Sequence, residues 1–354
     1  MRKVALAILV LFWLSASNFL QPLYAQSTPE LYITNIWARP TTFESADESM
    51  DGMNMDATQE ADMDMAGMDD MQMAIPPSAI YMTIINPTNE VVRLVSVDTP
   101  FATTQLHETT IENEVMQMRE IEGGITILEG EQVRLEQGGL HIMLIELTRE
   151  LLPGDALPLT LNFISVTTET TFSIVTAAPV LEGAPTINDT IIISGAWARA
   201  TLIGDMPATE EHAGMDMGNM EATEEAGMDG MDEMSMSIPP SAIYMTITNL
   251  GENNLNLIEI RSAVTQTAQI HETSLENDVM RMRELENGLI IPAGGNVLLE
   301  QGGYHIMMMA LTRELVASET VVDAISVTLI FDDGTEITIG VPVLENAASL
   351  NLDE

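Results

Sequence analysis

The segment IPPSAIYMTI occupies residues 75–84 and returns unchanged at residues 238–247. Two further motifs return in the same order, WAR at 37–39 and 197–199 and HET at 107–109 and 271–273. Their offsets change only from 160 residues (197 − 37) to 164 (271 − 107), so small insertions separate motifs that keep their order. A chain that repeats itself once at this length is expected to form two homologous domains rather than a solenoid.

The two domains are predicted at residues 31–181 and 190–346. The segment between them, EGAPTIND, has the composition of a linker. Short runs rich in Ile, Val, Thr and Leu, such as 91–97 and 157–166, alternate with Gly, Pro, Asn and Asp. This spacing favours an all-β fold, either a sandwich or a barrel, in each domain.

Charge and cysteine content exclude several classes of function. The 354 residues include 12 basic and 54 acidic side chains, for a net charge of −42, and no cysteine. Nucleic acids and anionic membrane surfaces are bound through Lys and Arg, so neither is an expected partner. Without Cys there are no disulfides, thiolate zinc sites or blue-copper centres. No Ser-His-Asp or P-loop pattern occurs, and we do not expect an enzyme.

Residues 1–25 are typical of an export signal. Arg2 and Lys3 precede an apolar run at 4–14, and a cut after Ala25 would leave a mature chain starting at Gln26. The alternative is an uncleaved N-terminal anchor. Either way the protein is expected outside the cytoplasm, in a periplasm, at the cell surface or secreted. A lipoprotein anchor is not expected, because no Cys exists to carry the lipid.

Each predicted domain contains an acidic, methionine-rich insert, at 41–73 and 201–236. The inserts hold sixteen of the 27 methionines and few β-branched or aromatic residues, so they are expected to be disordered when free. Closely spaced thioethers on a flexible chain can wrap a soft metal ion. The possible auxiliary metal ligands in the inserts are Met63, Met65, Met68, His212, Met215, Met217 and Met220.

One combination of histidines and methionines occurs in both domains with the same spacing. Ten residues separate the first His from the first Met, and 22 separate that Met from the second His. One residue separates the second His from the last Met. The two sets are His107, Met118, His141 and Met143, and His271, Met282, His305 and Met307. A single Met or His of this kind is usually core filler or a surface residue, but four together, twice over, indicate a metal site.

A tight turn at residues 112–113 would place His107 directly opposite Met118 in a hairpin, and a turn at 276–277 would do the same for His271 and Met282. His141 and Met143 are two apart and share one strand face. Two imidazoles and two thioethers, without thiolate or carboxylate, select Cu(I), about one per domain.

The sequence also predicts roles for several neighbours of these residues. Met116 and Met280 are possible further ligands. Met82, Met245 and Met308 are predicted in the core. Trp37 and Trp197 either cover a metal site or fill the interior of the sandwich, and we favour the interior.

The motifs resemble the PCu(A)C family of extracytoplasmic copper chaperones. The resemblance lies in LHET, VMQMR and LEQGGLHIML within residues 106–144 and in IHET, VMRMR and LEQGGYHIMMM within residues 270–309. It implies a cupredoxin-like Greek-key β-sandwich that holds Cu(I) by the two His and two Met of each motif. It further implies delivery to the copper centre of a respiratory oxidase subunit, or exchange with another copper chaperone. Two domains with methionine-rich inserts depart from the usual single domain and leave open extracytoplasmic copper buffering or resistance as an alternative.

Overall fold

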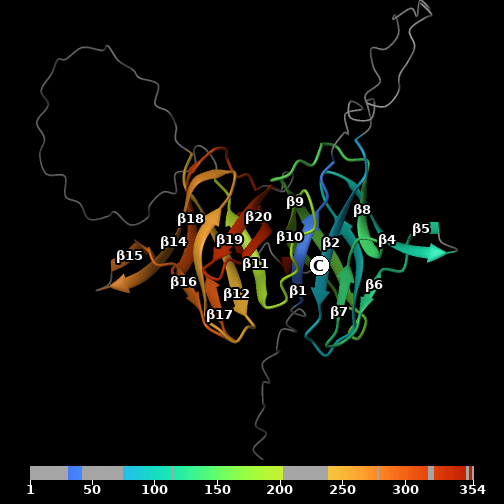
Figure 1. The fold of residues 1–354 in the computed structure, drawn as a ribbon, viewed down its shortest axis with the longest axis horizontal. Helices are drawn as coiled ribbons and strands as arrows, with labels where there is room; N and C mark the ends of the chain where they lie inside the picture. Colours follow the sequence, from blue (N-terminus) through green and yellow to red (C-terminus); the bar gives the residue numbers. More distant parts are fainter. Residues whose placement is uncertain are drawn as a thin grey trace, which may run out of the picture.

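The computed structural model describes residues 31–41, 75–112, 115–201, 238–276, 279–317, 323–347 and 351–352. The described residues form strands and connecting turns, without an α-helix (Figure 1). No helix in this part of the chain is long and apolar enough to cross a membrane. The predicted export signal and the bulk of both methionine-rich inserts lie outside the described residues.

The first domain consists of two sheets, which we name by what each one carries. The hairpin sheet contains, in spatial order, β1 (Tyr32–Ala38), β2 (Ser78–Ile85), β8 (Leu140–Ile145), β4 (Thr103–Glu112) and β5 (Val115–Glu120), with β7 (Gln132–Leu135) also paired to β2. The joining sheet contains β10 (Thr171–Pro179), β9 (Ala156–Ser165), β3 (Val92–Asp98) and β6 (Ile125–Ile127).

The second domain repeats this arrangement strand for strand. Its hairpin sheet contains β11 (Ile191–Arg199), β12 (Ser241–Asn249), β18 (Tyr304–Leu311), β14 (Thr265–Glu276) and β15 (Val279–Glu284), with β17 (Asn296–Leu299) paired to β12. Its joining sheet contains β20 (Glu336–Leu344), β19 (Ala324–Phe331), β13 (Leu255–Arg261) and β16 (Leu289–Ile291). The prediction of two tandem all-β sandwich domains is confirmed.

Alternation along the strands builds one core between the two sheets of each domain. On β2, Ile80, Met82 and Ile84 point inward and are fully buried against residues such as Leu94 and Phe163 of the joining sheet. Met245 and Met308 occupy the core of the second domain. These three methionines therefore fill the interior, as predicted, because successive strand residues face opposite sides.

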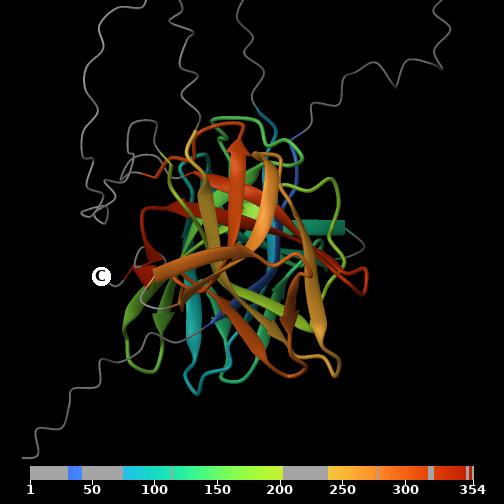
Figure 2. The same cartoon turned by 90° about the vertical axis from the view of Figure 1, so that its left-hand side faces the viewer.

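The joining sheets of the two domains meet edge to edge, where β10 pairs antiparallel with β20 at Ala177 and Gly340. Ala156, Ala177 and Ala324 form a small buried cluster at this contact. Seen end-on in Figure 2, the second domain stands in front of the first. A short strand at the C-terminal end, β21 (Asn351–Leu352), also pairs with β10 of the first domain.

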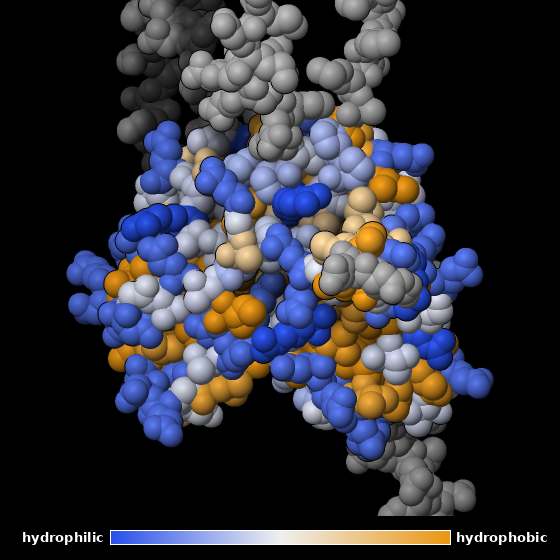
Figure 3. Space-filling model, turned by 45° about the vertical axis from the view of Figure 1, so that its right-hand side comes forward, coloured by the Kyte–Doolittle hydropathy of each residue, from blue (hydrophilic) through white to orange (hydrophobic). Residues whose placement is uncertain are grey.

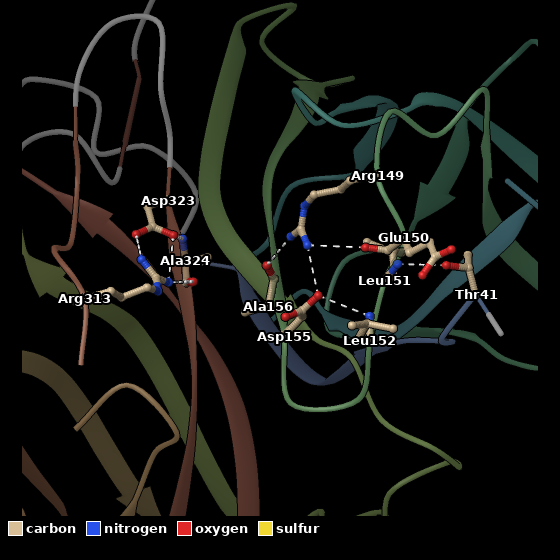
Figure 4. Close-up of polar contacts among 10 residues, drawn as sticks. All are labelled: Thr41, Arg149, Glu150, Leu151, Leu152, Asp155, Ala156, Arg313, Asp323 and Ala324. Atoms are coloured by element: carbon tan, nitrogen blue, oxygen red, sulfur yellow. Dashed lines mark hydrogen bonds and ion pairs between the residues drawn. The ribbon is translucent and has the colours of Figure 1, made fainter. Parts of the chain in front are cut away.

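Equivalent arginines of the two domains line a cavity of about 430 Å³ at the same junction. Arg149 donates to Asp155 at 2.9 Å and Arg313 pairs with Asp323 (Figure 4). Each ion pair is internal to its own domain and about a third exposed, so it orders a loop more than it stabilises the junction. The close backbone approach at Ala177 and Gly340, rather than either ion pair, is therefore the contact that joins the two domains.

Each insert starts from a fixed point in the fold. Two hydrogen bonds join Thr41 to Leu151. The Thr41 N–H donates to the Leu151 carbonyl at 2.9 Å, and the Leu151 N–H donates to the Thr41 hydroxyl at 2.7 Å (Figure 4). Thr201 and Leu315 repeat both bonds at 2.7 and 3.2 Å. These hydrogen bonds tie the first residue of each insert to the sandwich.

We predict that Gly340→Val separates the joined sheets. A Cβ at position 340 would lie 2.5 Å from the Ala177 carbonyl carbon and oxygen. These are backbone atoms, so no change of side-chain rotamer can relieve the clash. Overpacking of this kind costs about 1–3 kcal/mol. Thermal denaturation and small-angle scattering should show a less stable, more extended molecule. Gly183→Val is the matched control, because position 183 has open space around it; equal behaviour of the two variants would contradict the prediction.

Candidate metal site

The register of the first hairpin differs from the predicted one. β4 pairs with β5 so that His107 lies opposite Glu120 and Thr109 lies opposite Met118. His107 and Met118 still share one face, but they are diagonal neighbours, about 7–8 Å apart at the backbone rather than directly opposed. The predicted direct opposition is therefore wrong, in the second domain as well, where Met282 faces Thr273 and Glu284 faces His271.

Cross-strand charge explains the observed register. It places Glu108 directly opposite Arg119, with an ion pair of 2.9 Å, and Glu272 opposite Arg283, with one of 2.6 Å. A turn at 112–113 would have put Glu108 opposite Gln117 instead. Opposite charges across a ladder favour the register that pairs them, and the sequence already contained this signal.

The two histidines of each domain lie side by side on neighbouring strands. His107 on β4 is the direct cross-strand partner of His141 on β8, with ring centroids 5.7 Å apart and planes at 71°. His271 and His305 repeat this arrangement at 5.7 Å and 75°. Metal–imidazole bonds are about 2 Å long, so the space between the two rings is of the right size for one ion.

Hydrogen bonds orient both rings. Nδ1 of His141 lies 3.1 Å from the carbonyl oxygen of Gly139 and must donate to it, which leaves the lone pair of the neutral ring on Nε2. Nε2 of His107 lies 3.1 Å from Oε1 of Gln105, which leaves the lone pair on Nδ1. That Nδ1 is buried and has no hydrogen-bond partner.

The second domain repeats each of these contacts. His305 pairs with the Gly303 carbonyl at 3.2 Å, and His271 pairs with Gln269 at 3.2 Å. Nδ1 of His271 is again buried without a partner. A buried polar atom without a partner is costly, and in both domains this nitrogen keeps its lone pair available to a ligand.

Burial disfavours the charged form of one imidazole in each domain. Burial lowers the pKa of His107 below its usual 6.5, the nearby His141 lowers it further, and Glu120 raises it. In the second domain, burial lowers the pKa of His305, the hydrogen bond to Gly303 raises it, and His271 and Arg199 lower it. Neutral imidazole is the form that binds metals.

The predicted methionines lie on the histidine face at different depths. Met143 is half-buried beside His141, opposite Gln105, whereas Met118 is 52% exposed on β5. Met116 lies one step further toward the hairpin tip, as does Met280 in the second domain. Met282 and Met307 take the places of Met118 and Met143. Within the described residues, no three His, Cys or acidic side chains lie together closely enough to hold a metal.

Three neighbours of the histidines were missed from the sequence. Gln105 and Glu120 flank His107, and Tyr81 lies next to His141 with ring centroids 6.4 Å apart. Gln105 could have been found by alternation, since it precedes His107 by two residues on the same strand. Glu120 could have been found only through the hairpin register, for which the opposite charges of Glu108 and Arg119 were the available signal.

Trp37 does not fill the interior of the sandwich. It packs against Tyr81, with ring centroids 4.9 Å apart and planes at 35°, on the outer face of the hairpin sheet that also carries His141. These rings belong to a buried cluster separate from the core. A β-bulge between Thr34 and Trp37, with Asn35 at φ 51°, turns the strand so that Trp37 faces outward. Trp197 and Tyr244 repeat this contact at 4.7 Å.

The possible auxiliary ligands within the inserts, Met63, Met65, Met68, His212, Met215, Met217 and Met220, lie outside the described residues.

Comparison with known families gives a match to the family described as "Putative lipoprotein LpqE-like", over residues 31–175 and 191–343. The chain belongs to the LpqE-like family. The match falls once on each repeat, so this LpqE-like chain carries the family's domain twice, in tandem.

Among curated relatives, the chain is 36% identical over 103 residues to Putative lipoprotein Lxx21020 of Leifsonia xyli subsp. xyli. It is 29% identical over 103 residues to Uncharacterized protein RP573 of Rickettsia prowazekii. Each match covers 29% of this chain, and the chain spans 60% and 55% of the two relatives, respectively.

Similar solved structures are PCuAC domains and a related copper protein. The copper-bound PCuAC domain from PmoF2 matches with 18% identity and a TM-score of 0.29, over 45% of this chain and 97% of that domain. The Cu(I) form of DR1885 from Deinococcus radiodurans matches with 27% identity and a TM-score of 0.25, over 30% of this chain and 68% of that one.

We predict that His107 titrates below pH 6.5 in the metal-free protein, because burial disfavours its charged form. Glu120→Gln should lower this pKa further, since the carboxylate stabilises the imidazolium. NMR titration of the imidazole nitrogens measures both effects. Glu284→Gln, the same change in the other domain, is the control and should leave His107 unchanged; a pKa at or above 6.5 would contradict the assignment.

Proposed function

We propose that the protein is an exported copper chaperone that binds one Cu(I) in each domain. The observation that carries the proposal is the pair of facing imidazoles, each with its second nitrogen fixed by a hydrogen bond and its lone pair left available. The same arrangement occurs in both domains. Outer hydrogen bonds of this kind orient metal-binding histidines.

The chemistry of the donors favours Cu(I) as the cargo. Imidazole suits several transition metals, but thioether sulfur is soft and selects Cu(I). In the first domain His107 and His141 would bind the ion between the two strands, with Met143 at the buried side and Met118 at the exposed side. The second domain would use His271, His305, Met307 and Met282. An ion reached through an exposed methionine can be handed on by ligand exchange without unfolding the domain.

Export and delivery complete the proposal. Residues 1–25 would direct export, with cleavage near Ala25. The sequence lacks the Cys that would carry a lipid, although one relative is named a lipoprotein. The acceptor would be the copper centre of a respiratory oxidase subunit or another copper chaperone. A role in carrying an ion requires no catalytic group, consistent with a binding protein rather than an enzyme.

Removing the ligands should remove the sites one domain at a time. We expect two tight Cu(I) sites in the mature protein, measured anaerobically against a competing chelator. His107→Ala with His141→Ala should leave one site, as should the equivalent changes in the second domain. Met118→Leu with Met143→Leu should weaken the first site by at least about 10-fold while preserving volume. Met82→Leu, a core methionine, is the control; a variant lacking all four histidines that still binds two Cu(I) would refute the assignment.

The same titration tests copper buffering as the alternative function. A total above two in the intact protein, returning to two when residues 42–74 and 202–237 are replaced by short linkers, would favour buffering through the methionine-rich inserts. The hydrogen-bonded bases at Thr41 and Thr201 should allow this deletion without loss of the fold.

Copper affinity should depend on pH only in acid. Protons compete with Cu(I) for imidazole but not for thioether, and the pKa values of His107 and His305 lie below 6.5. Affinity should therefore be nearly constant between about pH 8 and about pH 7 and fall at lower pH, as the rings become charged. A steep fall already above neutral pH would indicate ligands other than these histidines.

A further inference from the structure

Exposed apolar side chains gather on the two hairpins. Of the seventeen large apolar side chains that are exposed in the described residues, eight lie on β4–β5 and β14–β15. They are Ile111, Val115, Met116, Met118, Leu275, Val279, Met280 and Met282, each 52–72% exposed. Single exposed apolar residues are ordinary, but a cluster repeated in both domains marks an interaction site.

Three of the four exposed apolar residues of each hairpin lie on one face, and the fourth, Val115 or Val279, lies on the other face opposite Glu112 or Glu276. Ile111 is paired directly with Met116, one step beyond Met118 and on the face that carries His107. Apart from Val115, the opposite face is polar and carries the ion pair between Glu108 and Arg119. Leu275 and Met280 repeat the apolar pair, and Glu272 and Arg283 repeat the ion pair. Each apolar face therefore extends the candidate metal site outward to the hairpin tip.

Each hairpin lies at the open edge of its sheet. β5 and β15 end the order of strands in their hairpin sheets. They project from opposite ends of the molecule's long axis (Figure 1), because the joining sheets meet in the middle. Figure 3 shows apolar side chains over the side from which the first hairpin projects. No described part of the chain covers the four residues of either tip.

We propose that the apolar face of each hairpin is the docking surface for a copper-exchanging protein, so that one chain engages two partner molecules, one at each end. The proposal rests on the proposed copper function and adds the surface and the kind of partner. Its partner has a metal site that opens on an apolar patch with a basic rim. A partner seated on Ile111 and Met116 would bring its own ligands next to Met118.

Charge selects this partner over the other possible occupants. The chain carries a net charge of −42, and exposed acids such as Glu120 and Glu122, or Glu284 and Glu286, stand beside each hairpin. A basic rim complements these acids, and such complementarity accelerates docking and fixes orientation. A second copy of this chain would present the same negative charge, and an anionic membrane would repel it.

The test compares paired serine variants of the full mature chain. Ile111→Ser with Leu275→Ser removes the centre of both apolar faces without touching a proposed ligand. Val95→Ser with Ile258→Ser is the matched control, because these residues are 43% and 50% exposed at equivalent positions of β3 and β13 in the joining sheets. Each protein is loaded with Cu(I), and transfer is followed to two acceptors. One acceptor is the apo soluble copper domain of a respiratory oxidase subunit from the same organism, and the other is bathocuproine disulfonate, which needs no docking.

We expect the hairpin variant to bind Cu(I) as tightly as the wild type and to lose it to the chelator at the same rate. Transfer to the protein acceptor should be about 10-fold slower, and rising salt should slow wild-type transfer. The joining-sheet control should match the wild type. Sedimentation of the wild type with excess acceptor should show two acceptors bound per chain.

Other outcomes overturn the proposal in distinguishable ways. Equal transfer by the hairpin variant and the wild type would show that the apolar face has no docking role. Wild-type transfer no faster than unassisted copper release would exclude assisted exchange with this class of acceptor. Hairpin-dependent binding to phosphatidylcholine vesicles, or a hairpin-dependent dimer, would replace the protein partner by a membrane or a second copy. If the wild type holds no Cu(I) against the chelator, the proposed function itself has failed.

Discussion

The pairing of β4 with β8 is the constraint on which the rest of the structure depends. Its register places Leu106 opposite Ile142 on the core side and His107 opposite His141 on the outer side. One ladder therefore fixes hydrophobic packing and the geometry of the histidine pair together. A slip of one residue would turn the imidazoles into the core and the apolar side chains outward. The burial of the core thus holds the two rings in place.

The supports of the histidines come from the same ladder. Gly139 and Gln105 precede His141 and His107 by two residues, and each provides the oxygen that orients its ring. Burial then disfavours protonation of His107. Preorganisation of this kind needs no residue from the partner domain, which is why the arrangement could be duplicated as a unit.

The edge-to-edge contact between the joining sheets determines how the two repeated domains are placed relative to each other. The contact between Ala177 and Gly340 leaves no room for a side chain at position 340, so it joins the two joining sheets closely. The last strands of the two hairpin sheets, β5 and β15, then stand at opposite ends of the molecule (Figure 1). The proposed copper sites, placed in this way, would meet separate partners more readily than each other.

The sequence predicted the all-β class and the two repeats, because alternation and repetition are local signals. The ligand role of His107, Met118, His141 and Met143 stays a prediction. The sequence did not predict the hairpin register, because the symmetric placement of His107 and Met118 competed with the cross-strand pairing of Glu108 and Arg119. The outward position of Trp37 was also missed, since a one-residue bulge at Asn35 reverses the face that simple alternation assigns.

By itself, then, the sequence determined which donor atoms exist, that no thiolate is among them, and that they occur twice at fixed intervals. Only the tertiary structure decided that the imidazoles are cross-strand partners, that Glu120 rather than Met118 faces His107, and that the two hairpins point apart. The physical reason is that strand order and register depend on contacts between residues far apart in the chain. Local composition specifies which side chains a strand offers to each face, but packing of the sheets selects the neighbours they meet.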